Sequence, residues 1–211
     1  MIKKIVFFPI IIAIFLNGCK DEALYNKTAS FWYNKILEGI DLSTLDSADS
    51  NFLSLKSEHR KSPLVGEAML LLAKAHLDFE EYEVAKYYYD SYIKMFGSRE
   101  NVEFAKFMKL KANYYSFNRA YRDQKLLIDT IEESKKFFDE YPDSIYKYEV
   151  KMIVSRISLA NIAMNKEIKK LYSKLDKPKG SEYYEMKIEA SDLSKVEYKD
   201  AATPWYRYPF E

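Results

Sequence analysis

Residues 66–99 read GEAMLLLAKAHLDFEEYEVAKYYYDSYIKMFGSR, and this stretch decides the fold. Along its first half, apolar side chains recur at three- and four-residue steps, which is the spacing of an amphipathic helix. The recurring residues are Leu64, Ala68, Leu71, Leu72, Ala75 and Phe79. We therefore predict one helix over 64–79 and a second over 81–96. We expect these two helices to approach each other closely at Ala73 and Ala85, because close approach requires small side chains.

The rest of the chain continues in the same way. It contains only five glycines and six prolines, and after residue 19 it has neither the Asn-Gly nor the Asp-Gly signal of a tight β-hairpin. Long stretches rich in Ala, Leu, Lys, Glu, Tyr and Met lie between these residues. The predicted helices cover 21–39, 46–61, 64–79, 81–96, 100–118, 123–140, 144–176 and 179–190. The stretch 144–176 is either one long helix or two helices broken near Asn165.

These helices also repeat along the chain. Ala68, Ala105 and Val150 occupy the same frame at intervals of 37 and 45 residues. Periods near 34 residues with helix–turn–helix content are typical of tetratricopeptide repeats, which bury their apolar faces by stacking. The sequence thus predicts an all-α tetratricopeptide-repeat superhelix (α-solenoid) of about four to five helix pairs over 19–190. We expect Gly39 and Gly97 just beyond helix ends, in the left-handed conformation, and N-caps at Asp46, Asp143 and Ser144.

Composition and charge exclude several function classes. Lys and Arg total 33 against 32 Asp and Glu, a net charge of +1, which argues against a nucleic-acid partner held by bulk positive charge. The single Cys excludes an intramolecular disulfide and a zinc site of several thiolates. His59 and His76 have no partner at ligand spacing, so we interpret both as structural. No catalytic or phosphate-binding motif is present. We predict no enzyme activity, no metal and no cofactor.

The first residues read as a targeting signal. Lys3 and Lys4 precede an apolar run over 5–16, which is too short to cross a membrane and typical of a secretory signal peptide over 1–18. The following Leu16-Asn17-Gly18-Cys19 resembles a bacterial lipobox, which implies acylation of Cys19 and a lipid anchor. In enteric bacteria an Asp directly after the lipobox Cys retains a lipoprotein in the inner membrane. This chain has Lys20 at that position, so the resemblance favours the outer membrane. The alternative is an ordinary signal peptide followed by an incidental Cys.

In tetratricopeptide folds the first helix of each pair lines a concave groove, and this resemblance assigns eight residues to a peptide-binding groove. They are Glu67, Leu70, Lys74, Leu77, Phe104, Phe107, Lys111 and Tyr114. Lys74 and Lys111 share one row, flanked by apolar and aromatic side chains. That row suits an extended peptide that ends in an aromatic residue and a carboxylate. The alternative is that the phenylalanines are core and the lysines ordinary surface.

The C-terminal segment 191–211 changes in character. It ends in Pro204-Trp205-Tyr206-Arg207-Tyr208-Pro209-Phe210-Glu211, where two prolines forbid a regular helix and rings are frequent. Either this aromatic tail folds back over the last helices, or it is a docking peptide for another protein.

Taken together, these features resemble the BamD family. The resemblance rests on the lipobox, the degenerate repeats, the opening Ala23-Leu24-Tyr25-Asn26, and a Tyr141-Pro142-Asp143-Ser144 junction after Phe137-Phe138-Asp139-Glu140. It covers most of 19–190. The chain departs from better-known members in the loop at 40–45, in a shortened last repeat and in the aromatic tail.

The resemblance implies a lipid-anchored scaffold on the periplasmic face of the outer membrane, within the β-barrel assembly complex. Its N-terminal repeats would hold C-terminal segments of nascent outer-membrane proteins, and its C-terminal repeats would dock onto periplasmic domains of a BamA-like insertase. The docking residues would be Lys177, Lys179, Tyr183, Tyr184 and Lys187. Two alternatives stay open: another repeat lipoprotein, such as a secretin pilotin or an envelope-coordination protein, and an envelope hydrolase with dispersed carboxylates.

Overall fold

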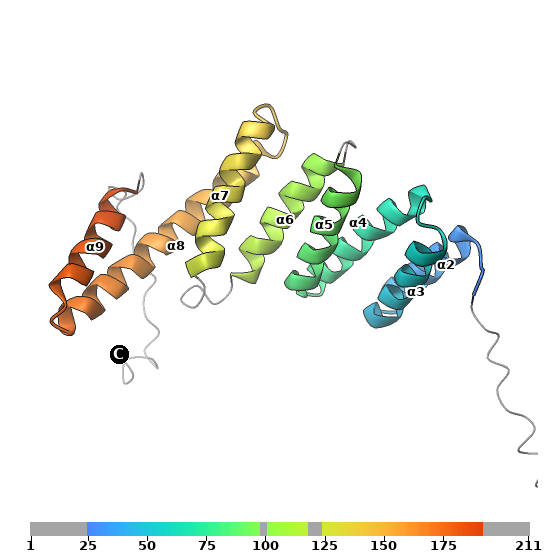
Figure 1. The fold of residues 1–211 in the computed structure, drawn as a ribbon, viewed down its shortest axis with the longest axis horizontal. Helices are drawn as coiled ribbons and strands as arrows, with labels where there is room; N and C mark the ends of the chain where they lie inside the picture. Colours follow the sequence, from blue (N-terminus) through green and yellow to red (C-terminus); the bar gives the residue numbers. More distant parts are fainter. Residues whose placement is uncertain (1–24, 98–100, 118–123, 192–211) are drawn as a thin grey trace, which may run out of the picture. The chain divides into compact units, whose positions relative to one another are not determined.

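The computed structural model describes residues 25–97, 101–117 and 124–191. Every regular element in these ranges is an α-helix, and short connections join successive helices (Figure 1). They are α2 (Ala29–Asp41), α3 (Leu45–Glu58), α4 (Pro63–Asp78), α5 (Tyr82–Phe96), α6 (Val102–Ser116), α7 (Gln124–Glu140), α8 (Lys147–Lys174) and α9 (Pro178–Glu189). Since the described ranges contain eight helices and no strand, the predicted all-α fold class is confirmed.

The helices form two compact units, Met1–Ala68 and Met69–Glu211, and the boundary falls inside α4. In the second unit each helix from α5 onward packs against the next one along the chain, and α6 also contacts α8. Contact between neighbours, and between first helices of successive pairs, is the packing of tetratricopeptide-like repeats. These contacts pair α2 with α3, α6 with α7 and α8 with α9, and the ring stack of His76 on Tyr88 joins α4 to α5, in agreement with the predicted succession of helix pairs.

In the first unit, α2 and α3 form an antiparallel pair that is closed at both ends. Near the turn, a Cβ built on Gly39 would lie 3.0 Å from both the Cβ and the backbone nitrogen of Ala48, so a side chain there would press on α3. At the end away from the turn, Trp32 Nε1 donates to Glu58 Oε2 at 2.7 Å, and the backbone N–H of Asn26 donates to Glu58 Oε1 at 3.1 Å. Small-residue contact and hydrogen bonds to one carboxylate therefore fix this pair.

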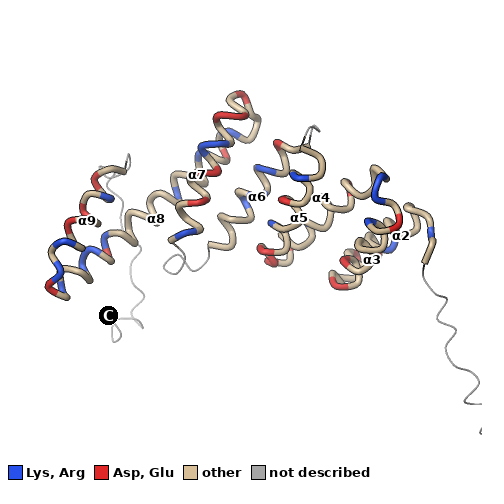
Figure 2. Tube along the Cα trace, viewed as in Figure 1, with Lys and Arg blue, Asp and Glu red and all other residues tan. Residues whose placement is uncertain are grey.

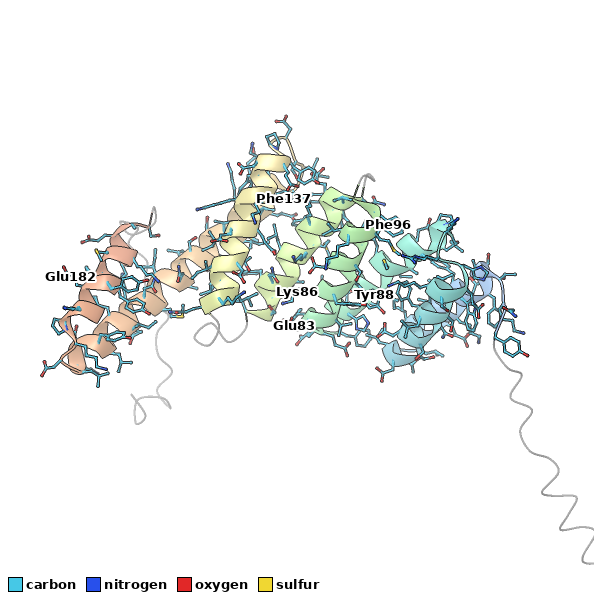
Figure 3. All side chains as sticks on the ribbon, viewed as in Figure 1. Glu83, Lys86, Tyr88, Phe96, Phe137 and Glu182 are labelled. Carbon is cyan, nitrogen blue, oxygen red and sulfur yellow. The ribbon has the colours of Figure 1, made fainter. Side chains whose placement is uncertain are left out.

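The second unit is held by apolar side chains from successive helices. Leu127 of α7 packs with Ile153, Ile157 and Met164 of α8, and partly buried aromatic residues of α6 cover this cluster. Phe137 is buried on α7 (Figure 3), with its ring centroid 5.3 Å from that of Tyr141. These contacts supply the continuous core that a single helix pair lacks.

Two helix starts differ from the sequence prediction. The helix expected over 21–39 begins at Ala29, because Thr28 caps it: its hydroxyl accepts the N–H of Phe31 at 3.2 Å. Residues 21–24 lie outside the described ranges. The last long helix begins at Lys147 rather than at Ser144, whose hydroxyl instead accepts the N–H of Tyr146 within the preceding turn. From there α8 runs unbroken through Asn165, which decides between one helix and two.

Most of the predicted caps differ in the structure. Gly39 lies inside α2, where its lack of a side chain permits the contact with Ala48. Gly97 follows the end of α5 directly, as predicted, but it has the right-handed φ of −54°. Tyr146, rather than Asp143 or Ser144, is the N-cap of α8. Asp46 is the second residue of α3, and Thr44 is its N-cap. The left-handed positions among the described residues belong to Asn26, Ser43, Glu80 and Asp176. Among the described residues, the left-handed conformation is therefore adopted by residues other than glycine.

None of the described helices combines the length and the apolar character that crossing a bilayer requires.

Candidate functional site

Both histidines serve the structure, as the sequence predicts. His76 is buried on α4, its Nδ1 lies 2.5 Å from Glu81 Oε2, and its ring stacks on Tyr88 with centroids 5.6 Å apart. His59 Nε2 lies 2.6 Å from the carbonyl oxygen of Lys27. These bonds fix the α4–α5 turn and the approach to α2. Within the described ranges, no group of three His, Cys, Asp or Glu residues is arranged to hold a metal ion.

The α4 row of the predicted groove is only partly open. Glu67 and Lys74 are exposed and Leu70 is half-buried, but Leu77 is buried in the core. Lys74 Nζ forms an ion pair with Asp78, one turn further along the same helix. An exposed pair of this kind contributes only about 0.3–0.5 kcal/mol, so a ligand carboxylate can replace Asp78 at little cost.

The α6 row is organised by an aromatic residue that the sequence analysis did not assign to a site. Tyr146, just before α8, stacks on Phe107 with centroids 4.4 Å apart and an interplanar angle of 6°, and its ring lies 6.2 Å from that of Phe104. Phe107 is buried, whereas Phe104 is half-buried. Phe107 is therefore a packing residue, and Phe104 is the ring of this row that a ligand could reach.

Further along α6, Lys111 and Tyr114 both contact neighbouring groups. Lys111 Nζ lies 5.8 Å from the ring centroid of Tyr115, and the hydroxyl of Tyr114 accepts a hydrogen bond of 2.8 Å from Arg156 Nη1 on α8. That hydrogen bond raises the pKa of the Arg156 guanidinium. It also fixes the Tyr114 ring between α6 and α8. The sequence held no local sign of Arg156, because 42 residues separate the two partners.

Phe104 borders an open cleft of about 420 Å³ between the start of α6 and the α7–α8 turn. Its walls are aromatic and acidic: Glu103, Phe104, Tyr141, Asp143 and Tyr146 line it with Asn101, Pro142, Ser144 and Ile145. Ile145 is almost fully exposed at the rim. The cleft extends the surface next to Phe104 into the Tyr141–Ser144 junction that the sequence analysis singled out.

A charged network connects α5, α6 and α7 near this surface. Lys109 Nζ lies 2.9 Å from Asp90 Oδ1 and 2.8 Å from Glu133 Oε1, and Lys106 forms an ion pair with Glu140. Burial lowers the pKa of Lys109, but hydrogen bonds to Glu133 and Asp90 outweigh it, so the net pKa is raised. Figure 2 shows both signs of charge interspersed on α7. The ion pairs of Lys109 join α6 to α5 and α7, and the ion pair of Lys106 joins α6 to α7.

The second predicted surface comes together on the α8–α9 pair. Lys187 Nζ lies 4.7 Å from the ring centroid of Tyr183 and 5.5 Å from that of Tyr184. Tyr184 in turn stacks on Tyr172 of α8 at 5.7 Å. Lys177 and Lys179 are exposed at the α8–α9 turn, at the other end of the helix. Three of the five docking residues thus form one aromatic and cationic cluster.

Cys19, the signal peptide 1–18 and residues 192–211 of the aromatic tail lie outside the described residues. Their roles, and the predicted domain boundaries at 18/19 and 190/191, stay predictions.

Two comparisons with known proteins agree with this picture. The model of a family described as "Outer membrane lipoprotein" (YfiO) matches residues 25–179, which is more than half of the chain. The chain is also similar to the outer membrane protein assembly factor BamD of Helicobacter pylori (strain ATCC 700392 / 26695). The two are 37% identical over 215 aligned residues, which cover 99% of this chain and 97% of that protein.

Proposed function

The chain belongs to the outer membrane lipoprotein family that includes BamD, and from this premise we propose that it is a lipid-anchored periplasmic scaffold for the assembly of outer-membrane β-barrel proteins. The observation that carries the proposal is the alignment with a BamD from end to end, at 37% identity. The helix pairs support it, because stacked repeats offer long surfaces to other polypeptides.

The anchor is assigned to Cys19. A single acyl chain holds a protein on a bilayer only marginally, whereas several chains on one residue make the attachment durable. With Cys19→Ala, we expect the protein to leave the membrane fraction of fractionated cells. Retention to the same extent would contradict the anchor.

The peptide groove is assigned to those residues of the predicted rows that are not buried: the exposed Glu67 and Lys74 and the half-buried Leu70, Phe104, Lys111 and Tyr114. Leu77 and Phe107 support this surface from below, because both are buried. The ammonium groups of Lys74 and Lys111 would bind a terminal carboxylate, and Phe104 would bind an aromatic side chain. A C-terminal segment of an unfolded barrel protein provides both groups.

The α8–α9 cluster of Tyr183, Tyr184 and Lys187, with Lys177 and Lys179, is assigned to the periplasmic domains of a BamA-like insertase. Tyrosine is among the side chains that most often anchor protein interfaces. The scaffold performs no chemical step in this proposal. By holding a substrate near the insertase, the scaffold raises the effective concentration of the substrate at the insertase.

The test is the identity of the membrane protein that co-purifies. We expect the full chain, extracted from membranes in mild detergent, to bring down a barrel insertase identified by mass spectrometry. Recovery of a secretin in its place would support a pilotin and contradict the proposal. The same extraction with Lys187→Glu and Tyr183→Ala should recover less insertase, while Lys151→Glu, an exposed change on α8, should recover the wild-type amount.

A further inference from the structure

The last helix pair leaves large apolar side chains open to solvent. Leu171 of α8 and Leu175, the residue that caps its C-terminal end, are each 54% exposed, and Tyr183 of α9 is 49% exposed. Large exposed apolar side chains gathered on a folded protein commonly mark a surface that something covers. We call these three residues, together with the neighbouring Tyr184, the α8–α9 strip.

The strip lies along one edge of the helix pair. The opposite edge is defined by Lys169, which pairs with Glu185, and by the hydroxyls of Ser173 and Ser181, which lie 2.8 Å apart. Residues on a helix turn by about 100° per position, so Leu171 and Leu175 fall on the other side of α8 from Lys169 and Ser173. Because Lys169 pairs with Glu185 and Ser173 with Ser181, the antiparallel arrangement places Tyr183 at the same height along the helix pair as Leu171. By the same rotation per residue, Tyr183 lies on the side of α9 away from Ser181 and Glu185.

The chain itself supplies a segment of fitting chemistry close by. Residues 192–211 follow α9 directly, and their last part carries four aromatic rings between or beside two prolines, namely Trp205, Tyr206, Tyr208 and Phe210. We propose that residues 204–210 of the same chain dock on the α8–α9 strip. The inference does not depend on the proposed function or on any partner.

The geometry permits this docking. The intervening residues 192–203 span at most about 40 Å when extended, whereas Tyr183 lies only about 9 Å back from the end of α9. A short tether of this kind gives the segment a high effective concentration at the strip. Because Pro204 and Pro209 fix φ on both sides of the rings, the segment has less conformational freedom to lose on binding.

The aromatic surface matches such a segment. Proline-containing extended peptides typically bind in grooves lined by aromatic rings, and the strip contains Tyr183 and Tyr184 in T-shaped contact at 5.3 Å. The family model ends at residue 179, whereas the alignment with the Helicobacter pylori BamD covers 99% of the chain. The strip's α9 half and its occupant therefore both lie beyond the part matched by the family model.

Tyr183 and Tyr184 also belong to the surface assigned above to the insertase.

The two tryptophans of the chain make the docking measurable. Trp32 is buried and bonded to Glu58, so it serves as an internal reference for Trp205. We suggest labelling the full chain with 5-fluorotryptophan, purifying it in detergent, and assigning the Trp205 signal in the ¹⁹F spectrum with Trp205→Phe. A synthetic peptide of residues 192–211 gives the position of the undocked signal.

We expect the Trp205 ¹⁹F signal to lie away from the peptide position and to be protected from a soluble paramagnetic agent, which broadens the ¹⁹F signals of exposed side chains. Leu171→Asp with Leu175→Asp should return it to the peptide position, and Tyr183→Ala should move it in the same direction without adding charge. The matched control, Ile128→Asp with Met152→Asp, changes two similarly exposed apolar residues and should leave it unchanged.

Three results would overturn the proposal. The first is a wild-type Trp205 signal already at the peptide position. The second is a signal that stays in place in both the double strip variant and Tyr183→Ala, while circular dichroism shows both folded. The third is protection that disappears on dilution, which would assign the strip to the tail of a second copy.

Discussion

The α2–α3 pair and the α8–α9 pair are both antiparallel, yet they are closed by opposite means. In α2–α3, Gly39 meets Ala48 at backbone distance, and Glu58 accepts two hydrogen bonds at the far end. In α8–α9, Tyr172 stacks on Tyr184, the hydroxyls of Ser173 and Ser181 lie 2.8 Å apart, and large apolar side chains remain exposed. Close backbone contact leaves no room for change, whereas an aromatic contact can adjust and presents rings to a partner.

The contrast is tested most severely at Gly39. We expect Gly39→Val to destabilise the α2–α3 pair by about 3 kcal/mol, because the added side chain would press on the backbone of Ala48, which cannot move without displacing α3. Urea unfolding followed by circular dichroism measures this. A milder pair of variants sharpens the test: Ala48→Gly should partly rescue Gly39→Ala, since one of the two colliding Cβ atoms is then absent.

The next largest effect is expected at Glu58. With Glu58→Ala, the partly buried Trp32 Nε1–H and the Asn26 N–H both lose their acceptor. The free energy of unfolding should fall by about 2 kcal/mol, because removing a charged acceptor leaves a partly buried donor without a hydrogen bond. Glu38→Ala, an exposed residue paired only with Lys35 one turn away, is the control and should cost less than about 0.5 kcal/mol. Equal losses for both variants would contradict the structural role of Glu58.

Variants of the groove lysines should affect binding and not stability. We expect Lys74→Glu with Lys111→Glu to weaken binding of a barrel protein's C-terminal peptide about tenfold or more, because two ammonium groups are replaced by charges that repel its carboxylate. Fluorescence anisotropy of a labelled peptide measures the affinity. The control, Lys135→Glu with Lys151→Glu, makes the same change in net charge on exposed residues of α7 and α8. If both double variants weaken binding equally, the effect is bulk charge and the groove assignment fails.

The smallest effect is expected at Gly180. A Cβ there would press on the ring of Tyr172, which belongs to a half-buried side chain and not to the backbone. Alanine also favours a helix over glycine by about 1 kcal/mol, which offsets the displacement of the ring. We therefore expect Gly180→Ala to change the unfolding free energy by less than about 1 kcal/mol. A loss as large as that of Gly39→Val would remove the distinction between the two pairs.

Much of the fold could be predicted from the sequence, because helix periodicity is a local property. Helix starts and ends away from the first helix fall within about three residues of their predicted positions, the expected uncertainty of such assignments. The first helix start was missed because Thr28 gives an ordinary polar signal, and only its bond to Phe31 shows the cap. Gly39 is not a cap, because packing against Ala48, and not a reversal of the backbone, requires a glycine at this position.

The candidate site divides in the same way. The rows on α4 and α6 follow from helical spacing, but Leu77 and Phe107 prove to be buried. Burial depends on which helices come to lie beside them, and Tyr146, 39 residues beyond Phe107, is what covers that ring. The cluster of Tyr183, Tyr184 and Lys187 could be predicted because its members are neighbours on one helix.

By itself, the sequence determined that the chain is made of paired helices, that a lipobox-like segment precedes them, and which residue types line each helix face. These follow from periodicity and composition, which short stretches of chain encode. Only the tertiary structure decided that Arg156 holds Tyr114, that Glu58 holds Trp32, and that Tyr146 covers Phe107. Such contacts join residues far apart in the chain, and their geometry exists only once the helices have packed.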